Sequence, residues 1–322
     1  MSATVSPDRI LKQLADLWTA EGRQGDAGVL RACSMTLVVI AEVSDDPSAL
    51  GETLAALMPE HPARTILVRL SGDGERALAE RVYQQCWMPF GQRRQICCEQ
   101  IEITVSDAAL ADLPSVLLPL QVPDLPVILW CRSARLTDLP ERRELAGIAT
   151  KMVFDSTNAP NPAQALGRLR DACGKGLLVA DLAWTTLTRW RESLARLFDN
   201  RDYLARLAEV QSVRVAFPSG LASAAWYLAA WAANALGRAP SVVPGASALR
   251  LELSSPGFSV SLAREDDRLV TTVDGKSSCA SLPAPTGYLL MREELAIVRR
   301  DPVFERTLEL AARLAVHSSS EG

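Results

Sequence analysis

The first half of the chain alternates short apolar runs with helical patterns. Apolar runs rich in Val and Ile predict buried strands at 34–43, 64–70, 127–131 and 151–155. Helical spacing of apolar residues predicts helices over 5–22, 46–58 and 162–173. A strand, a helix and a second strand in quick succession form a βαβ unit. This half is therefore predicted to be an α/β domain with a mixed, largely parallel sheet flanked by helices.

Two segments of the same half depart from this regular alternation. The run at 95–105 alternates imperfectly and predicts a strand with a bulge near Glu99. The stretch 114–126 holds four prolines, which predicts an extended, stiff connector and no helix.

The second half combines helices with strands whose side chains alternate between apolar and polar. Apolar residues predict a helix over 182–198, and an Ala-rich helix is expected from a cap at Ser219 to Gly237. Alternation predicts strands at 213–217, 249–253, 258–262 and 268–273, with a loop at 239–247 and a last helix over 299–317. These features predict an α+β domain with an antiparallel meander. The boundary is expected at the Gly-Lys-Gly hinge, which gives domains 1–175 and 176–322.

Composition and charge exclude several classes of partner. The chain has 322 residues, 48% hydrophobic and 22% charged, which is typical of two packed domains. A net charge of −4 offers no electrostatic footprint for nucleic acid. The longest apolar stretch, 221–236, is too short and too rich in Ala to span a membrane. The first residues lack a secretory pattern, and seven cysteines without scaffold spacing indicate a reducing cytoplasm.

The usual signatures of a metal or nucleotide site do not occur in the sequence. His61 and His317 are its two histidines, and Cys97 and Cys98 are adjacent residues whose side chains point to opposite faces of a strand. No glycine-rich dinucleotide or phosphate-binding fingerprint occurs, and no nucleophile elbow is present. We therefore expect no metal, no cofactor and no catalytic residue of these kinds.

His61 and Arg64 are the strongest candidates for chemistry. His61 is suited to act as a general base, and Arg64 to clamp a phosphate at the entry to a strand. In the alternative interpretation, His61 closes a loop by hydrogen bonds and Arg64 pairs with a carboxylate. The alternative is favoured because no second catalytic group lies within sequence reach.

Tryptophan and arginine are concentrated in the predicted helix over 182–198. Trp184 and Trp190 fit the core side of this helix, yet Trp beside Arg191 is also typical of protein interfaces. Both roles stay open. Trp226 and Trp231 are separated by about 140° on a helix, so they cannot both face one neighbour. Asp181 is expected to cap a helix or to form a pair.

Several segments in a fixed order resemble one known family. They are RACSMTLVVIAE (31–42), HPARTILVRL (61–70), CCEQIEI (97–103), LPLQVPDLPVILWCRS (118–133), VFDS (153–156), DLAWTTLTRWRESLARLFD (181–199) and WYLAAWAANALG (226–237). This set resembles the OpcA family of glucose-6-phosphate dehydrogenase assembly proteins. The resemblance covers most of residues 30–240.

The resemblance implies a non-catalytic protein of the oxidative pentose phosphate pathway. Such a protein binds glucose-6-phosphate dehydrogenase and promotes its active oligomer. The residues that match the family, and are candidates for partner binding, are His61, Arg64, Asp124, Trp130, Asp155, Asp181, Trp184, Thr188, Trp190 and Arg191.

Two other hypotheses are kept beside this one. An enzyme acting on a sugar phosphate would bring His61 and Arg64 together with a carboxylate such as Asp155 in one cleft. A redox-responsive scaffold would need an exposed thiol of low pKa at Cys97 or Cys98.

Overall fold

The computed structural model describes residues 6–21, 29–72, 74–88, 95–137 and 142–320. Contacts divide the chain into two units, Met1–Phe154 with Gly287–Val298, and Asp155–Thr286 with Arg299–Gly322. This division differs from the expected boundary at residue 175. The helix predicted over 162–173 contacts the last helix of the chain and so belongs to unit 2, whereas residues 287–298 return to unit 1.

Unit 1 is built on a largely parallel sheet, as predicted. Neighbouring strands in the order β1-β5-β3-β2-β6-β7 run parallel. Their bounds are β1 (Val29–Arg31), β2 (Met35–Glu42), β3 (Ala63–Leu70), β5 (Gln95–Val105), β6 (Val127–Cys131) and β7 (Lys151–Phe154). A further strand, β4 (Leu78–Trp87), pairs antiparallel with β5. The apolar runs of β2 and β3 are buried along nearly their whole length, because helices cover both faces of the sheet.

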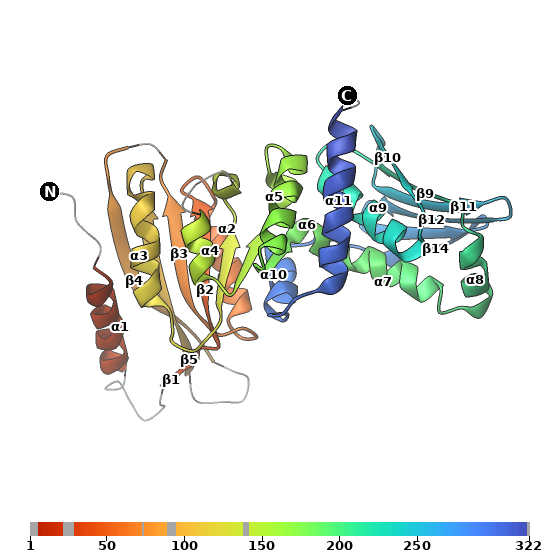
Figure 1. Ribbon diagram of the computed structural model, residues 1–322. Coiled ribbons are helices and arrows are strands. Elements are labelled where there is room, and N and C mark those ends of the chain that lie inside the picture. Colours follow the sequence, from red (N-terminus) through yellow and green to blue (C-terminus); the bar gives the residue numbers. More distant parts are fainter. Residues whose placement is uncertain (1–5, 22–28, 73, 89–94, 138–141, 321–322) are drawn as a thin grey trace. The chain divides into compact units, whose positions relative to one another are not determined.

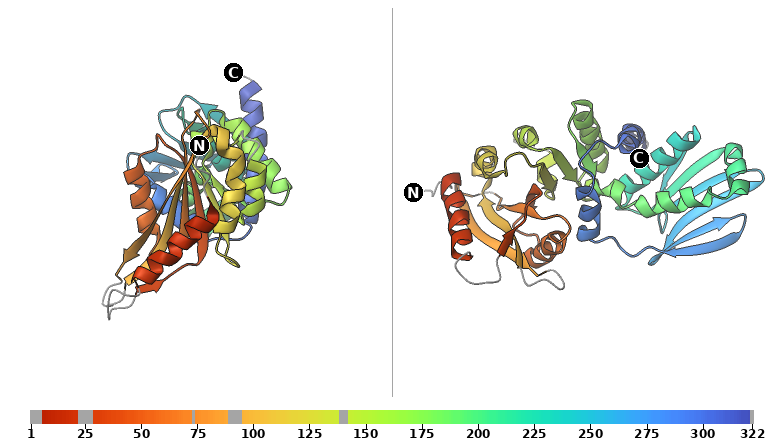
Figure 2. Two further views of the ribbon diagram at one scale, coloured as in Figure 1. Left: turned by 90° about the vertical axis from the view of Figure 1, so that its left-hand side faces the viewer. Right: turned by 90° about the horizontal axis from the view of Figure 1, so that it is seen from below.

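Right-handed crossovers place the helices of unit 1 on opposite faces of the sheet. The chain passes from β2 to β3 in one direction and from β5 to β6 in the other, so α2 and α3 lie on opposite sides (Figure 2). α10 packs beside α2, whereas α1 and α4 pack beside α3. The bounds are α1 (Pro7–Glu21), α2 (Pro47–Leu57), α3 (Leu113–Leu120), α4 (Arg142–Ile148) and α10 (Gly287–Leu295), with 3-10 turns η1 (Asp107–Asp112) and η2 (Ala134–Thr137).

Two expectations for unit 1 are wrong. The proline-rich stretch expected to be extended contains helix α3, because Pro114 occupies the first turn, where a missing N–H costs nothing, and Pro119 comes one residue before the end. No bulge occurs near Glu99, since the register between β4 and β5 runs without a break from Leu78 opposite Val105 to Trp87 opposite Ile96.

Unit 2 contains a six-stranded sheet, ordered β10-β9-β11-β12-β13-β14. Only β9 and β10 pair in parallel, and the other neighbours form the predicted antiparallel meander. Their bounds are β9 (Ser212–Phe217), β10 (Pro240–Pro244), β11 (Arg250–Ser255), β12 (Phe258–Glu265), β13 (Arg268–Val273) and β14 (Lys276–Ser281). β10 lies inside the stretch predicted as a loop, which its proline-rich composition concealed.

The longest helices of unit 2, α9 and α11, pack side by side (Figure 1). α9 also contacts β9 and β10, and it ends at Gly237 in the left-handed region, as predicted. The expected cap at Ser219 is wrong, because α9 begins at Ala222 without a side-chain cap. The remaining elements are η3 (Ser156–Asn158), β8 (Val179–Asp181), η4 (Leu207–Glu209) and the helices α5 (Pro162–Gly174), α6 (Leu182–Thr185), α7 (Thr188–Leu197), α8 (Arg201–Arg206), α9 (Ala222–Leu236) and α11 (Pro302–Ser320). Nowhere in the described ranges is a helix both long enough and apolar enough to cross a membrane.

Candidate functional site

The strand order of unit 1 defines where a ligand would be expected to bind. The chain leaves β2 toward β3 on one side, and β6 lies on the other side, so β2 marks the point where the direction of winding reverses. In open α/β sheets, ligands bind at the carboxyl ends of the strands beside such a point. The relevant backbone is the connection from β2 to α2, residues 43–46.

That connection carries carboxylates in place of glycines. Glu42, Asp45 and Asp46 lie at the end of β2 and in the turn that follows it. The side chain of Asp46 accepts a hydrogen bond of 2.8 Å from the backbone N–H of Ser48 at the start of α2. A dinucleotide pyrophosphate would need the same N–H groups and close approach of a glycine backbone. The donor set at this turn therefore does not fit a dinucleotide.

Three arginines surround this turn within unit 1: Arg132 and Arg135 pair with its carboxylates, whereas Arg69 binds backbone carbonyls. Arg69 donates to the backbone carbonyls of Val43 and Asp45 at 2.9 and 3.2 Å. Arg132 pairs with the Asp45 carboxylate at 3.3 Å.

Arg135 completes the cluster. It pairs with Glu42 at 3.4 Å and also with Asp107, whose hydrogen bond raises the pKa of the guanidinium. Ser133 donates to Glu42 as well. This charge cluster at the end of β2, which sequence reasoning missed, consists of groups that already bind one another.

A second cluster lies in unit 2 and gathers several residues of the family motif around Asp181. The Asp181 carboxylate is fully buried and caps α6 by accepting from the N–H of Ala183 at 3.0 Å, which confirms the predicted capping role. It also accepts from the N–H of Ser156 at 3.0 Å and from the hydroxyl of Tyr227 at 2.9 Å. Burial raises the pKa of Asp181 to about 6. One carboxylate thus connects η3, β8, α6 and α9.

Asp155 lies next to Ser156 of this cluster and caps the η3 turn. Its carboxylate accepts from the N–H of Thr157 at 3.1 Å and from the side-chain amide of Asn158 at 2.6 Å. It therefore caps the η3 turn whose first N–H group binds Asp181.

Arg191 stacks on Trp184 at the start of α7. Its guanidinium lies 3.4 Å from the ring centroid of Trp184. It donates to the carbonyl of Trp184 at 2.9 Å and to the hydroxyl of Thr188 at 3.0 Å. Trp184 and Trp190 are buried, whereas Thr188 and Arg191 are half-buried. In this segment, the two tryptophans belong to the core, and Thr188 and Arg191 reach the surface.

In unit 1, Arg64 and His61 do not form a common site. Arg64 is buried and pairs with Glu99 at 2.6 Å, which confirms that it pairs with a carboxylate, and it donates to the carbonyl of Leu120 at 2.9 Å. Arg31 and Trp18 bind the same Glu99 at 2.9 and 2.7 Å. Arg64 is thus occupied and unsuited to clamp a phosphate.

The remaining candidates of unit 1 also have structural surroundings. The backbone N–H of half-buried His61 donates to the carbonyl of Leu57 at 2.8 Å and closes the turn after α2. Trp130 is buried on β6. Asp124 is exposed in the connection from α3 to β6, with a left-handed φ of 64°.

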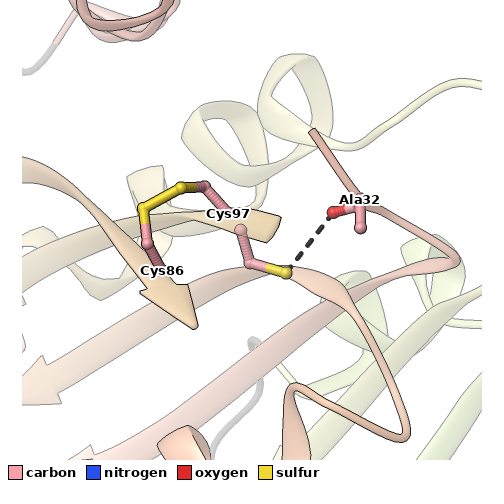
Figure 3. Close-up of a disulfide and its surroundings, with 4 residues drawn as sticks. Ala32, Cys86 and Cys97 are labelled. Carbon is pink, nitrogen blue, oxygen red and sulfur yellow. Dashed lines mark hydrogen bonds between the residues drawn. A yellow bond between two sulfur atoms is a disulfide. The ribbon is translucent and has the colours of Figure 1, made fainter. Parts of the chain in front are cut away.

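Two cysteines are joined in a way that the sequence did not predict. Cys86 on β4 and Cys97 on β5 lie opposite each other in the register and form a disulfide (Figure 3). Cys98 follows Cys97 directly on β5, so its side chain lies on the other face, as predicted, and its thiol donates to the carbonyl of Ala32 at 3.4 Å. Burial raises the pKa of Cys98 to about 11, so its thiol is unreactive at neutral pH. The bond was missed because β4 itself was missed.

A groove between α9 and α11 has a volume of about 260 Å³. Its lining includes half-buried Trp231, whereas Trp226 of the same helix is buried. The prediction that these two tryptophans face different surroundings is confirmed. The other lining residues are Asn234, Ala235, Val303, Arg306 and Thr307.

Comparison with known families identifies both parts of the chain. The profile described as "Glucose-6-phosphate dehydrogenase subunit N-terminal domain" matches residues 55–171, and that of the C-terminal domain matches residues 178–308. The chain belongs to the OpcA family. The two OpcA profiles meet close to residue 175, although the contacts divide the chain elsewhere.

Two curated OpcA relatives from cyanobacteria are longer than this chain. Both are named "Putative OxPP cycle protein OpcA". The protein from Synechococcus elongatus is 26% identical over 245 residues, which are 74% of this chain and 52% of the relative. The protein from Nostoc punctiforme is 26% identical over 221 residues, or 67% and 45%. The chain thus spans about half the length of the curated relatives it matches.

Solved structures of oxidoreductases share the fold. A mutant of KijD10, a 3-ketoreductase from Actinomadura kijaniata determined with TDP-benzene and NADP, aligns with a TM-score of 0.51 at 12% identity, covering 88% of this chain and 97% of its own. An oxidoreductase from Sinorhizobium meliloti aligns with a TM-score of 0.50 at 11% identity, covering 89% and 98%. At such low identity the likeness shows the fold alone.

Proposed function

We propose that this OpcA protein is a non-catalytic partner of glucose-6-phosphate dehydrogenase that promotes the active oligomer of the enzyme. The observation that carries the proposal is the match of two dehydrogenase-subunit profiles, in order, to residues 55–171 and 178–308. The proposed role belongs to the oxidative pentose phosphate pathway, which the names of the two cyanobacterial relatives give for those proteins. We further propose that the encounter occurs in the cytoplasm. The five free cysteines of the described residues support this, whereas the Cys86–Cys97 disulfide is uncommon in that compartment.

The charge cluster at the end of β2 in unit 1 supports a non-catalytic role. Oxidoreductases of similar fold were crystallised with NADP, yet Asp45 and Asp46 stand here where a pyrophosphate would need backbone N–H groups. Arginine is a residue type that binds phosphate, but here Arg69 and Arg132 bind groups of the protein itself. Arg64 is likewise occupied by Glu99, which speaks against the alternative of a sugar-phosphate enzyme.

Activation by a binding partner requires a difference in affinity between two states of the enzyme. A protein that binds the active oligomer more tightly shifts the population toward it, and a coupling of about 1–3 kcal/mol corresponds to about 5–150-fold. We assign direct contact with the enzyme to the accessible motif residues, which are His61, Asp124, Asp155, Thr188 and Arg191. The buried motif residues shape these surfaces, and they are Arg64, Trp130, Asp181, Trp184 and Trp190.

The test is the initial rate of the host's glucose-6-phosphate dehydrogenase over a range of glucose 6-phosphate, with and without this protein. We expect a saturable fall in apparent KM or a rise in kcat, and co-elution of the two proteins. Arg191→Ala should weaken the effect, and Arg214→Ala, on the sheet of the same unit, serves as the matched control. An unchanged rate together with separate elution would refute the proposal.

A further inference from the structure

The six-stranded sheet of unit 2 ends in an unusual edge strand. β14 pairs with β13, and among the strands of the described chain none pairs with its other side. All six residues of β14, Lys276–Ser281, are exposed. Apart from Lys276 they are Ser, Cys and Ala, which are small and uncharged.

The opposite edge of the same sheet is protected. β10 begins at Pro240 and ends at Pro244, and proline has no N–H to offer to another strand. β14 contains no proline, and its register with β13 is unbroken from Lys276 opposite Val273 to Ser281 opposite Arg268. A regular edge strand without such protection is a template for pairing with another chain.

The hairpin geometry shows which backbone groups are available. The N–H of Leu282 donates to the carbonyl of Asp267, so residues 276, 278, 280 and 282 direct their backbone groups toward β13. The turn at Asp274 and Gly275, both with positive φ, fits this register. The N–H and C=O groups of Ser277, Cys279 and Ser281 therefore point outward from the sheet.

We propose that β14 pairs antiparallel with β14 of a second copy of this chain, about a two-fold axis that passes through Cys279. This register places Ser277 opposite Ser281 and uses the whole strand. Lys276 then lies opposite Leu282, so no like charges meet. Between these two end pairs only small side chains line the seam, and the two sheets continue into each other.

Self-pairing fits this strand because a two-fold contact brings each residue against its own strand. Charged or large side chains on such an edge would repel or clash with the same side chains of the second copy. Ser277, Cys279 and Ser281 are small and uncharged, so they do neither. A single strand edge is small for an interface, so we expect a reversible dimer that forms as concentration rises. This inference is independent of the dehydrogenase proposal.

The test measures the molar mass of the full chain by sedimentation across the micromolar range. Cys279→Pro removes an outward N–H from each copy and leaves the groups that face β13 in place. We expect it to raise the dimer dissociation constant roughly tenfold or more. Cys279→Ala keeps the N–H and should dimerise normally.

Two lysine substitutions, one on each edge strand of the sheet, supply a test and its matched control. Ser277→Lys adds like charges to the seam and should weaken the dimer, whereas Ser241→Lys, on the protected edge strand β10, should not. A bis-maleimide should link Cys279 to Cys279 of the second copy, and Cys279→Ala should abolish the link.

Three results would overturn the proposal. A chain that stays monomeric throughout has no such pairing. A dimer that survives both Cys279→Pro and Ser277→Lys uses another surface. A monomeric chain whose activation of the dehydrogenase is lost in Cys279→Pro uses the edge for the enzyme.

Discussion

The two sheets differ in how much of each strand they bury. The parallel sheet of unit 1 is covered on both faces, so its strands β2 and β3 are almost entirely apolar and buried. The meander of unit 2 alternates buried and exposed residues and ends in an exposed strand. Each sheet carries a cross-strand ion pair, Arg64–Glu99 at 2.6 Å and Arg214–Glu252 at 2.9 Å. Ion pairs of similar length therefore contribute differently to stability when one is buried and the other is exposed to solvent.

The largest expected effect separates these two ion pairs. Arg64→Ala leaves Glu99, 3% exposed, without its closest cation and should lower the free energy of unfolding by about 4 kcal/mol. Arg214→Ala, whose side chain is 48% exposed, should cost less than about 1 kcal/mol. Urea denaturation followed by circular dichroism measures both. Equal losses would contradict the distinction.

The next effect concerns the disulfide, which only the sheet of unit 1 has among the described residues. Cys86 and Cys97 are separated by 11 positions, and reducing a bond that closes a loop of this size should lower the free energy of unfolding by about 3 kcal/mol. Urea denaturation with and without dithiothreitol measures the change. In Cys86→Ala, dithiothreitol should have no effect, and an equal effect there would place its action at another cysteine.

A pH-dependent effect is expected in unit 2. Unfolded Asp ionises near 3.8, whereas burial raises the pKa of Asp181 to about 6. Between these values the unfolded state releases its proton and the folded state keeps it. The contribution of Asp181 to stability therefore falls by roughly 2–3 kcal/mol as pH rises from about 4 to 6, and is constant above.

Asp181→Asn tests this dependence. The amide oxygen can still accept from Ser156 and Ala183, and Tyr227 can accept from the amide nitrogen. The stability of the variant relative to the natural protein should rise across the same pH window. A difference that does not change with pH would show that Asp181 ionises normally. Thermal denaturation at several pH values gives the answer.

The smallest effect concerns the stacked arginine of unit 2. Arg191→Lys keeps the charge but loses the planar stacking on Trp184 and one of two donors, so it should cost about 1 kcal/mol. For comparison, Trp190→Ala removes a core side chain of the same helix and should cost more, about 3 kcal/mol or above. If Arg191→Lys weakens activation of the dehydrogenase while stability changes this little, Arg191 contacts the enzyme. Thermal denaturation and the rate assay together decide.

The sequence predicted those elements whose pattern reflects their own burial. β2, β3, β6 and the meander follow from apolar runs or from alternation. β4 was missed because its sequence, LAERVYQQCW, is polar and only partly buried. Helix α3 was misjudged because proline was counted without regard to its position in a first turn.

The contacts of the candidate sites could be predicted where the partners are near in sequence, and not where they are distant. The capping role of Asp181 could be predicted because Ala183 is near in sequence. The partner of Arg64 lies 35 positions away, and the charge cluster at the end of β2 joins Glu42 to Arg135 across 93 positions. Such pairs are set by sheet order, which a single sequence does not encode locally.

Lys151 has a consequence for how the chain is made. Its buried ammonium donates to the carboxylate of Glu294 at 2.6 Å, and to the carbonyls of Glu294 and Ile297, both at 2.8 Å. During synthesis, β7 leaves the ribosome more than 130 residues before α10, because all of Asp155–Thr286 lies between them. Until then this amine lacks the acceptors that the finished protein gives it. Unit 1 therefore stays incomplete until residues 287–298 have been synthesised, although most of it is made first. A nascent chain halted before residue 287 should be open to protease around β7.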